Sequence, residues 1–149
     1  MSLRIGKAEV RLSIGVLPLF AALLILGEGR ALAYSALSLL LHECAHAIAA
    51  KNLGFGLRRI SIWPFGAVMH LEPFGSEPNS EWIVSLAGPL GSFVIASCVR
   101  LFAHALPAYA EALDPFTRTN AAIALFNLLP AYPLDGGRLS KALLMPRVS

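Results

Sequence analysis

Long apolar stretches limit the fold of this chain more than any other feature of its sequence. Four stretches carry few or no charged residues: Leu12–Gly27, Ala31–Ala50, Trp82–Val99 and Thr119–Leu134. A helix needs about 20 apolar residues to cross a hydrocarbon core about 30 Å thick. A bilayer offers no water to unpaired backbone groups, so such segments cross it as helices. The stretches therefore predict about four transmembrane helices.

The overall composition also favours a membrane protein. Of the 149 residues, 56% are hydrophobic and only 14% are charged, whereas soluble domains carry about 25% charged residues. The net charge of +3 and the pI of about 9.2 raise the question of nucleic acid binding. The basic residues are few and scattered and no recognition motif accompanies them, so we expect no nucleic acid partner. The length indicates a single core domain over residues 1–149.

The segment between the second and third stretches differs in kind. In Gly54–Glu77, β-branched and aromatic residues alternate with polar ones. This pattern predicts two short strands or a hairpin, near Leu57–Trp63 and Ala67–Glu72. Gly54 is a plausible C-cap of the preceding helix. The expected fold is an α-helical polytopic membrane protein with a small membrane-associated β-hairpin or sheet between its second and third helices.

The end of the chain is less regular. The fourth stretch breaks at Asn127–Arg138, which contains two prolines and a Gly-Gly pair. Residues 104–118, with Glu111, Asp114 and Pro115, are expected to form a loop.

The second apolar stretch contains an H-E-x-x-H motif, formed by His42, Glu43 and His46. On a helix, the two histidines lie on one face, one turn apart, and can bind one metal ion. Glu43 lies about 100° further round the helix, where it can reach a water molecule at the metal. Ionisable residues inside a transmembrane segment are costly and are usually functional. The motif therefore predicts a zinc site within the membrane.

A catalytic zinc ion takes three protein ligands and keeps one position open, so a third ligand is needed. Asp135 is the best candidate, because it ends an apolar stretch and precedes Gly136-Gly137, where backbone can approach closely. His70 on the predicted strands and His104 at the far end of the third stretch are weaker candidates.

The basic residues predict the orientation of the chain. With the N-terminus inside, nine basic residues fall on the inner side and three on the outer side. The inner set is Arg4, Lys7, Arg11, Lys51, Arg58, Arg59, Arg138, Lys141 and Arg147, and the outer set is Arg30, Arg100 and Arg118. The positive-inside rule thus places both termini in the cytoplasm and the metal site toward the cytoplasmic side. This orientation places His42, His46 and Asp135 at similar depth in the membrane, as a shared metal ion requires.

The motifs together resemble the site-2 protease family of intramembrane zinc metalloproteases. The resemblance rests on His42-Glu43-x-x-His46, then Ala87-Gly88-Pro89, then Asn127-x-x-Pro130-x-x-Pro133-Leu134-Asp135-Gly136-Gly137. Pro64–Gly66 between the first two makes the chain most similar to the branch of the stage IV sporulation protein FB. Two positions depart from the family pattern: Ser92 stands where Asn is common, and Ala67 where a second Gly is common.

The resemblance implies one Zn2+ per chain, bound by His42, His46 and Asp135, with Glu43 as general base and acid. It implies that Asn127 hydrogen-bonds the substrate or the oxyanion. The strand segment would correspond to a membrane-associated sheet whose edge receives the substrate as an added strand. No PDZ-like insertion or CBS domain is visible in these residues.

The expected function is hydrolysis of a peptide bond in or near the transmembrane segment of a membrane-anchored protein, in a bacterial cell membrane. Besides the bilayer, a second copy of the chain or a regulatory membrane protein is a candidate partner. An alternative is a non-catalytic membrane scaffold or metal-binding regulator, against which the intact Glu43 argues. A transporter would show inverted repeats, and none is visible.

Overall fold

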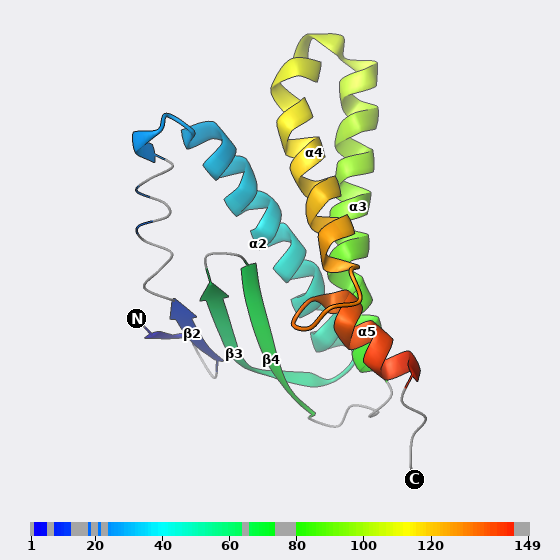
Figure 1. The fold of residues 1–149 in the computed structure, drawn as a ribbon. Helices are drawn as coiled ribbons and strands as arrows, with labels where there is room; N and C mark the ends of the chain where they lie inside the picture. The colour runs from blue at the N-terminus through cyan, green and yellow to red at the C-terminus, as the bar shows by residue number, and fades with distance from the viewer. Residues whose placement is uncertain are drawn as a thin grey trace.

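The computed structural model describes residues 2–5, 8–12, 18, 21, 24–63, 66–73 and 80–144. Its strands are β1 (Ser2–Ile5), β2 (Ala8–Leu12), β3 (Phe55–Trp63) and β4 (Gly66–Pro73). Its helices are α2 (Gly29–Asn52), α3 (Glu81–Ala105), the 3-10 turn η1 (Pro107–Tyr109), α4 (Ala110–Asn127) and α5 (Asp135–Leu144). Figure 1 shows α3 and α4 as a helical hairpin beside α2, with α5 and the strands near the opposite end from the hairpin's turn.

Helix α2 carries the H-E-x-x-H motif and is buried along one narrow stripe. Its buried residues are Ser38, His42, His46 and Ala50, each one turn after the last. The helix ends where Gly54 adopts a positive φ of 77°, a conformation that glycine adopts without steric cost. The N–H of Leu53 donates to the Ala49 carbonyl at 3.0 Å, which closes the last turn.

Helix α3 runs antiparallel to α2 and packs closely against it through glycines. A Cβ atom on Gly91 would lie 2.7 Å from the Cβ of Ala45. One on Gly88 would lie 2.2 Å from Nε2 of His46. Small residues at such an interface let two helical backbones approach each other. The metal motif therefore lies against the glycine-containing face of α3.

The segment after α4 returns the chain toward α2. Residues 128–134 leave the helix, and α5 then begins at Asp135. A Cβ atom on Gly136 would lie 2.2 Å from the Leu128 carbonyl oxygen, and one on Gly137 would lie 2.7 Å from Ala131. The close backbone approach expected at Gly136-Gly137 is therefore present, and it fixes where α5 starts.

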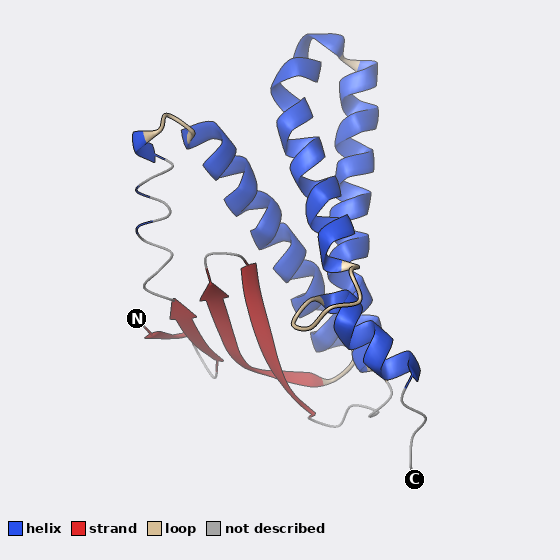
Figure 2. Ribbon diagram, viewed as in Figure 1, coloured by secondary structure: helices blue, strands red, loops and turns tan. Residues whose placement is uncertain are grey.

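The strands form one four-stranded sheet with the order β1-β2-β3-β4. The outer pairs β1–β2 and β3–β4 are antiparallel, and β2 pairs with β3 in parallel. Figure 2 shows the strands gathered beside the lower half of α2. A small apolar core of Ala50, Phe55 and Val84 joins the end of α2 to β3 and α3.

The second and third apolar stretches lie within α2 and α3. Among the described residues, these two helices are long and apolar enough to cross a membrane. The predicted first span, Leu12–Gly27, falls largely outside the described residues. Strands β3 and β4 contain the ranges proposed for them, whereas β1, β2 and α5 were not anticipated.

The prediction of a loop over residues 104–118 was wrong. Helix α3 continues to Ala105, and α4 already begins at Ala110 and ends at Asn127. Charges at the start of α4 hid it, although Glu111 in the first turn suits the positive end of a helix. The predicted fourth span, Thr119–Leu134, is only partly helical, because α4 ends at Asn127 and residues 128–134 lie between α4 and α5.

Candidate metal centre

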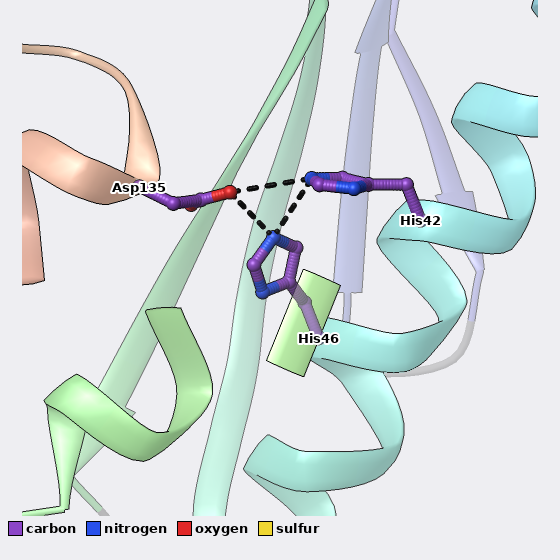
Figure 3. Close-up of side chains that lie close together, drawn as sticks. All are labelled: His42, His46 and Asp135. Atoms are coloured by element: carbon purple, nitrogen blue, oxygen red, sulfur yellow. Dashed lines mark hydrogen bonds and ion pairs between the residues drawn. The ribbon is translucent and has the colours of Figure 1, made fainter. Parts of the chain in front are cut away.

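Three side chains from two elements converge on one point. His42 and His46 extend from the buried stripe of α2, and Asp135 extends from the first residue of α5 (Figure 3). Nε2 of His42 lies 3.2 Å from Nε2 of His46 and 3.2 Å from Oδ2 of Asp135. Nε2 of His46 lies 3.0 Å from the same carboxylate oxygen. These atoms form a nearly equilateral triangle that can hold a metal ion.

The triangle has the size that tetrahedral zinc requires. With ligands at about 2.0–2.1 Å and tetrahedral angles, two ligand atoms stand about 3.3–3.4 Å apart. The three distances in the structure are 3.0, 3.2 and 3.2 Å. Two imidazoles and one carboxylate also form a common ligand set of catalytic zinc sites. The donor set and its spacing therefore fit a zinc ion.

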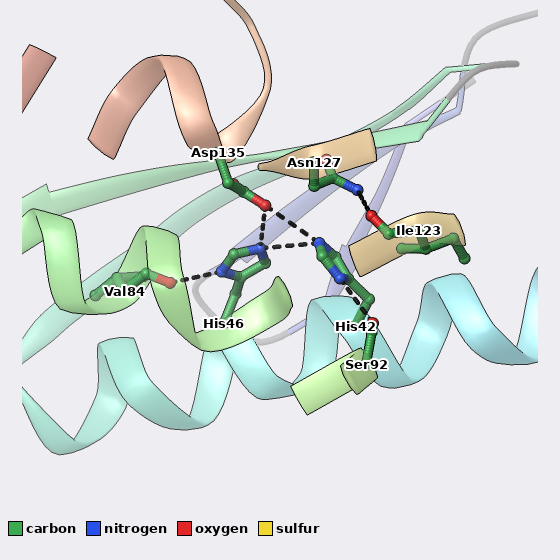
Figure 4. Close-up of polar contacts among 7 residues, drawn as sticks. All are labelled: His42, His46, Val84, Ser92, Ile123, Asn127 and Asp135. Carbon is green, nitrogen blue, oxygen red and sulfur yellow. Dashed lines mark hydrogen bonds and ion pairs between the residues drawn. The ribbon is translucent and has the colours of Figure 1, made fainter. Parts of the chain in front are cut away.

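The outer nitrogens of both histidines have partners on α3 (Figure 4). Nδ1 of His46 donates to the Val84 carbonyl at 2.7 Å, because a carbonyl oxygen can only accept. Nδ1 of His42 lies 3.0 Å from the hydroxyl oxygen of Ser92. A proton on the outer nitrogen leaves the inner nitrogen as a lone pair, the form that binds a metal.

Gly88 makes room for the second of these rings. The position that a Cβ atom would take on Gly88 is only 2.2 Å from Nε2 of His46 and 2.5 Å from its Cε1. Pro89 follows, and a proline inside a helix opens the preceding turn. Val84, whose carbonyl accepts from His46, lies just over one turn before Pro89. The Ala87-Gly88-Pro89 motif thus lies where α3 accommodates and anchors His46.

Asp135 is only partly exposed and lies outside both helices of membrane-spanning length. Burial by itself would raise the pKa of its carboxyl group. When the two imidazoles carry protons on Nε2, their hydrogen bonds and charge outweigh burial and hold the pKa of Asp135 below its ordinary value. Asp135 is therefore a carboxylate, as a metal ligand must be.

Glu43 and Asn127, the two residues expected to act on the substrate, lie on the helices that surround the triangle. Glu43 directly follows His42 on α2 and is partly buried. Asn127 is the last residue of α4, and its side-chain Nδ2 donates to the Ile123 carbonyl at 2.9 Å (Figure 4). One of its two amide hydrogens is used in this way. Their catalytic roles stay predictions.

Of the two weaker third-ligand candidates, the structure places one, His104, away from the triangle. His104 is exposed near the end of α3, remote in the chain from the residues that contact the triangle. His70 pairs with Arg59 across β3 and β4, and its side chain lies outside the described part of the structure. Val84 could not be predicted from the sequence, because a backbone acceptor leaves no signal in residue type. Ser92 stood out only because it occupies a position where the family commonly has Asn.

The fold matches that of a solved protein. A site-2 protease from Methanocaldococcus jannaschii aligns with a TM-score of 0.77 and 24% identity, over 97% of this chain and 71% of that chain. Independently of that likeness, an H-E-x-x-H helix with a carboxylate as third ligand defines a metallopeptidase class of site.

The sequence comparison identifies the family. Residues 31–112 match the model of peptidase family M50, and the chain belongs to that family. Rip3 of Mycobacterium tuberculosis, by its name a candidate zinc metalloprotease, is 36% identical over 129 residues, covering 83% of this chain and 33% of that protein. Stage IV sporulation protein FB of Bacillus subtilis is 34% identical over 117 residues, covering 78% of this chain and 41% of that protein. The chain thus spans about a third to two-fifths of the length of these relatives.

Proposed function

We propose that this chain is an intramembrane zinc metalloprotease that cleaves a membrane-anchored protein in or near its transmembrane segment. The observation that carries the proposal is the triangle of His42, His46 and Asp135, with distances of 3.0–3.2 Å, directly beside Glu43. Membership of the M50 peptidase family supports the same activity.

The surface of the helices supports a membrane setting. Large apolar side chains face outward, with Leu40 59%, Ile48 62% and Leu101 71% exposed. In the most apolar 18-residue part of each helix, only 17% of the residues of α2 and 33% of those of α3 are buried inside the molecule. So many exposed apolar side chains are unfavourable in water and suit lipid. We propose that α2, α3, α4 and the stretch 12–27 give about four crossings.

The chemistry follows from the types of residue at the site. A bound zinc ion would act as a Lewis acid and lower the pKa of water at its open position. Glu43 would accept a proton from the attacking water and then deliver it to the nitrogen of the leaving amine. Among the described residues, the Asn127 amide donates to the Ile123 carbonyl, and its second hydrogen is available for another acceptor. In this proposal, that hydrogen is donated to the substrate or to the developing oxyanion.

A strand edge near the site would help to hold the substrate. A transmembrane helix satisfies its carbonyls internally, so a bond in it becomes accessible only when the helix unwinds. In the described sheet, β4 is an outer strand. We propose that it supplies replacement backbone hydrogen bonds to an unwound substrate segment. The same proposal places the site toward the cytoplasm and treats residues 1–149 as a single core domain. Its expected partner is another membrane protein or a second copy of the chain.

Replacement of Glu43 by glutamine tests the enzymatic part of the proposal. Glu43→Gln keeps the shape of the side chain but removes the base, so cleavage should fall by about 10²–10⁴-fold. The measurement is cleavage of a co-expressed single-span membrane protein in bacterial cells. Glu28→Gln is the matched control, because Glu28 is exposed before the start of α2 and should not affect cleavage.

Undiminished cleavage by Glu43→Gln would contradict the protease proposal. A chain that binds zinc but cleaves nothing with Glu43 intact would instead support a metal-binding regulator.

A further inference from the structure

We propose that Ser92 is a positioning residue that fixes the ring orientation and tautomer of His42, so that Nε2 of His42 is available to the metal. This inference rests on the proposed zinc site and assigns one residue a role in it. It starts from a single buried contact, in which the Ser92 hydroxyl oxygen lies 3.0 Å from Nδ1 of His42.

The position of the proton follows from the triangle. Nε2 of His42 lies 3.2 Å from both Nε2 of His46 and Oδ2 of Asp135. To bind a metal among these atoms, Nε2 must present its lone pair, and the neutral ring then carries its proton on Nδ1. Nδ1–H therefore donates, and the Ser92 hydroxyl oxygen accepts.

The burial of the pair makes this contact consequential. Ser92 is 0% exposed and His42 is 1% exposed, so water cannot take the place of the hydroxyl. A buried donor without an acceptor is costly. Without Ser92, the ring would gain by moving its proton to Nε2 or by turning over, and either change removes the lone pair from the triangle.

The helix geometry places Ser92 there for a simple reason. Helices α2 and α3 are antiparallel, so Gly88 lies opposite His46 and the residue one turn later lies opposite His42. Each histidine thus has its own partner on α3. His46 uses the Val84 carbonyl, which no side-chain substitution can remove, whereas His42 depends on a side chain.

The full chain, purified in detergent, allows a direct test by zinc affinity. Ser92→Ala should bind zinc about 10–100-fold more weakly than wild type, the range typical for loss of a partner of a metal-binding histidine. Ser92→Thr keeps the hydroxyl and should bind more tightly than Ser92→Ala. Ser97→Ala is the control on the same helix, because Ser97 is exposed and its hydroxyl donates to the Phe93 carbonyl within that helix. It should match wild type.

The tautomer can be observed independently of affinity. In the zinc-loaded wild-type chain labelled with ¹⁵N-histidine, long-range ¹H–¹⁵N NMR should show the His42 proton on Nδ1. In Ser92→Ala this signal should shift or be lost through exchange. A His42 proton on Nε2 in the wild type would overturn the proposal even if the variant fails to fold.

Equal zinc affinity in wild type and Ser92→Ala would also overturn the role of Ser92 while leaving the zinc site standing. Absence of zinc binding by the wild type would overturn the site and this inference together.

Discussion

At the scale of single residues, the site depends on space as much as on ligands. His46 must lie against α3 for its Nδ1 to reach the Val84 carbonyl at 2.7 Å while its Nε2 faces Asp135. Only a residue without a Cβ atom leaves room for the ring at position 88. The requirement for glycine there is steric and comes from the metal ligand itself.

Gly88→Ala is therefore expected to abolish tight zinc binding. The new methyl group would lie 2.2 Å from Nε2 of His46, so the ring or the helix must move by more than a zinc–ligand bond tolerates. Gly29→Ala is the control, because its Cβ atom would have only an ordinary contact of 3.8 Å with Leu24. Isothermal titration with zinc measures both variants, and wild-type affinity in Gly88→Ala would contradict the packing of α3 on His46.

The residues with distinctive chemistry could be predicted, and those that support them could not. His42, His46 and Asp135 were proposed as ligands because ionisable groups in an apolar sequence are conspicuous, and the structure brings the three together. Val84 acts through its backbone, and Ser92 is a common helix residue whose burial depends on how α2 and α3 pack.

At the scale of helices and strands, α2 is positioned by polar contacts along one stripe. Beyond the metal ligands, this stripe contacts α4. The Tyr34 hydroxyl donates to the Ala112 carbonyl at 2.9 Å, and Ser38 accepts from Nδ2 of Asn120 at 2.8 Å. Ser38 and Asn120 are both 0% exposed. Hydrogen bonds between helices help to hold membrane proteins together, because apolar side chains have little preference for each other over lipid.

A double-mutant cycle on Ser38→Ala and Asn120→Ala should show this coupling. We expect about 0.6 kcal/mol, and at most about 1.7 kcal/mol, as is typical of such bonds in membranes. The value stays small because Asn120 also donates to the Phe116 carbonyl, so its amide group keeps a partner when the Ser38 hydroxyl is removed. Reversible unfolding in mixed detergent measures the cycle. Coupling indistinguishable from zero would show that this bond does not hold α2 against α4.

The same scale shows where sequence patterns are insufficient. Apolar stretches located α2 and α3 because hydrophobicity decides which segments enter lipid. The pattern gave no sign of α5 or of β1 and β2. The pairing of β2 with β3 joins residues about fifty positions apart, such as Glu9 with Arg59, and local sequence does not specify such a partner.

At the scale of the whole molecule, the site exists only when distant segments meet. His42 and Asp135 are 93 residues apart in the chain, yet their ligand atoms lie 3.2 Å from each other. Helix α2 supplies two ligands, α3 orients them, and the segment after α4 returns Asp135 to them. Asp135 can therefore bind the metal ion only when the fold has formed and brought α5 to α2.

Zinc content of the purified chain tests this account most directly. Wild type should retain about one zinc ion per chain, and His46→Ala and Asp135→Ala should retain almost none after dialysis, because each loses one of three ligands. Asp114→Ala is the control, since Asp114 pairs with Arg118 and Arg100 away from the triangle. It should hold as much zinc as wild type. Equal zinc in wild type and Asp135→Ala would contradict the three-ligand site on which the proposed protease depends.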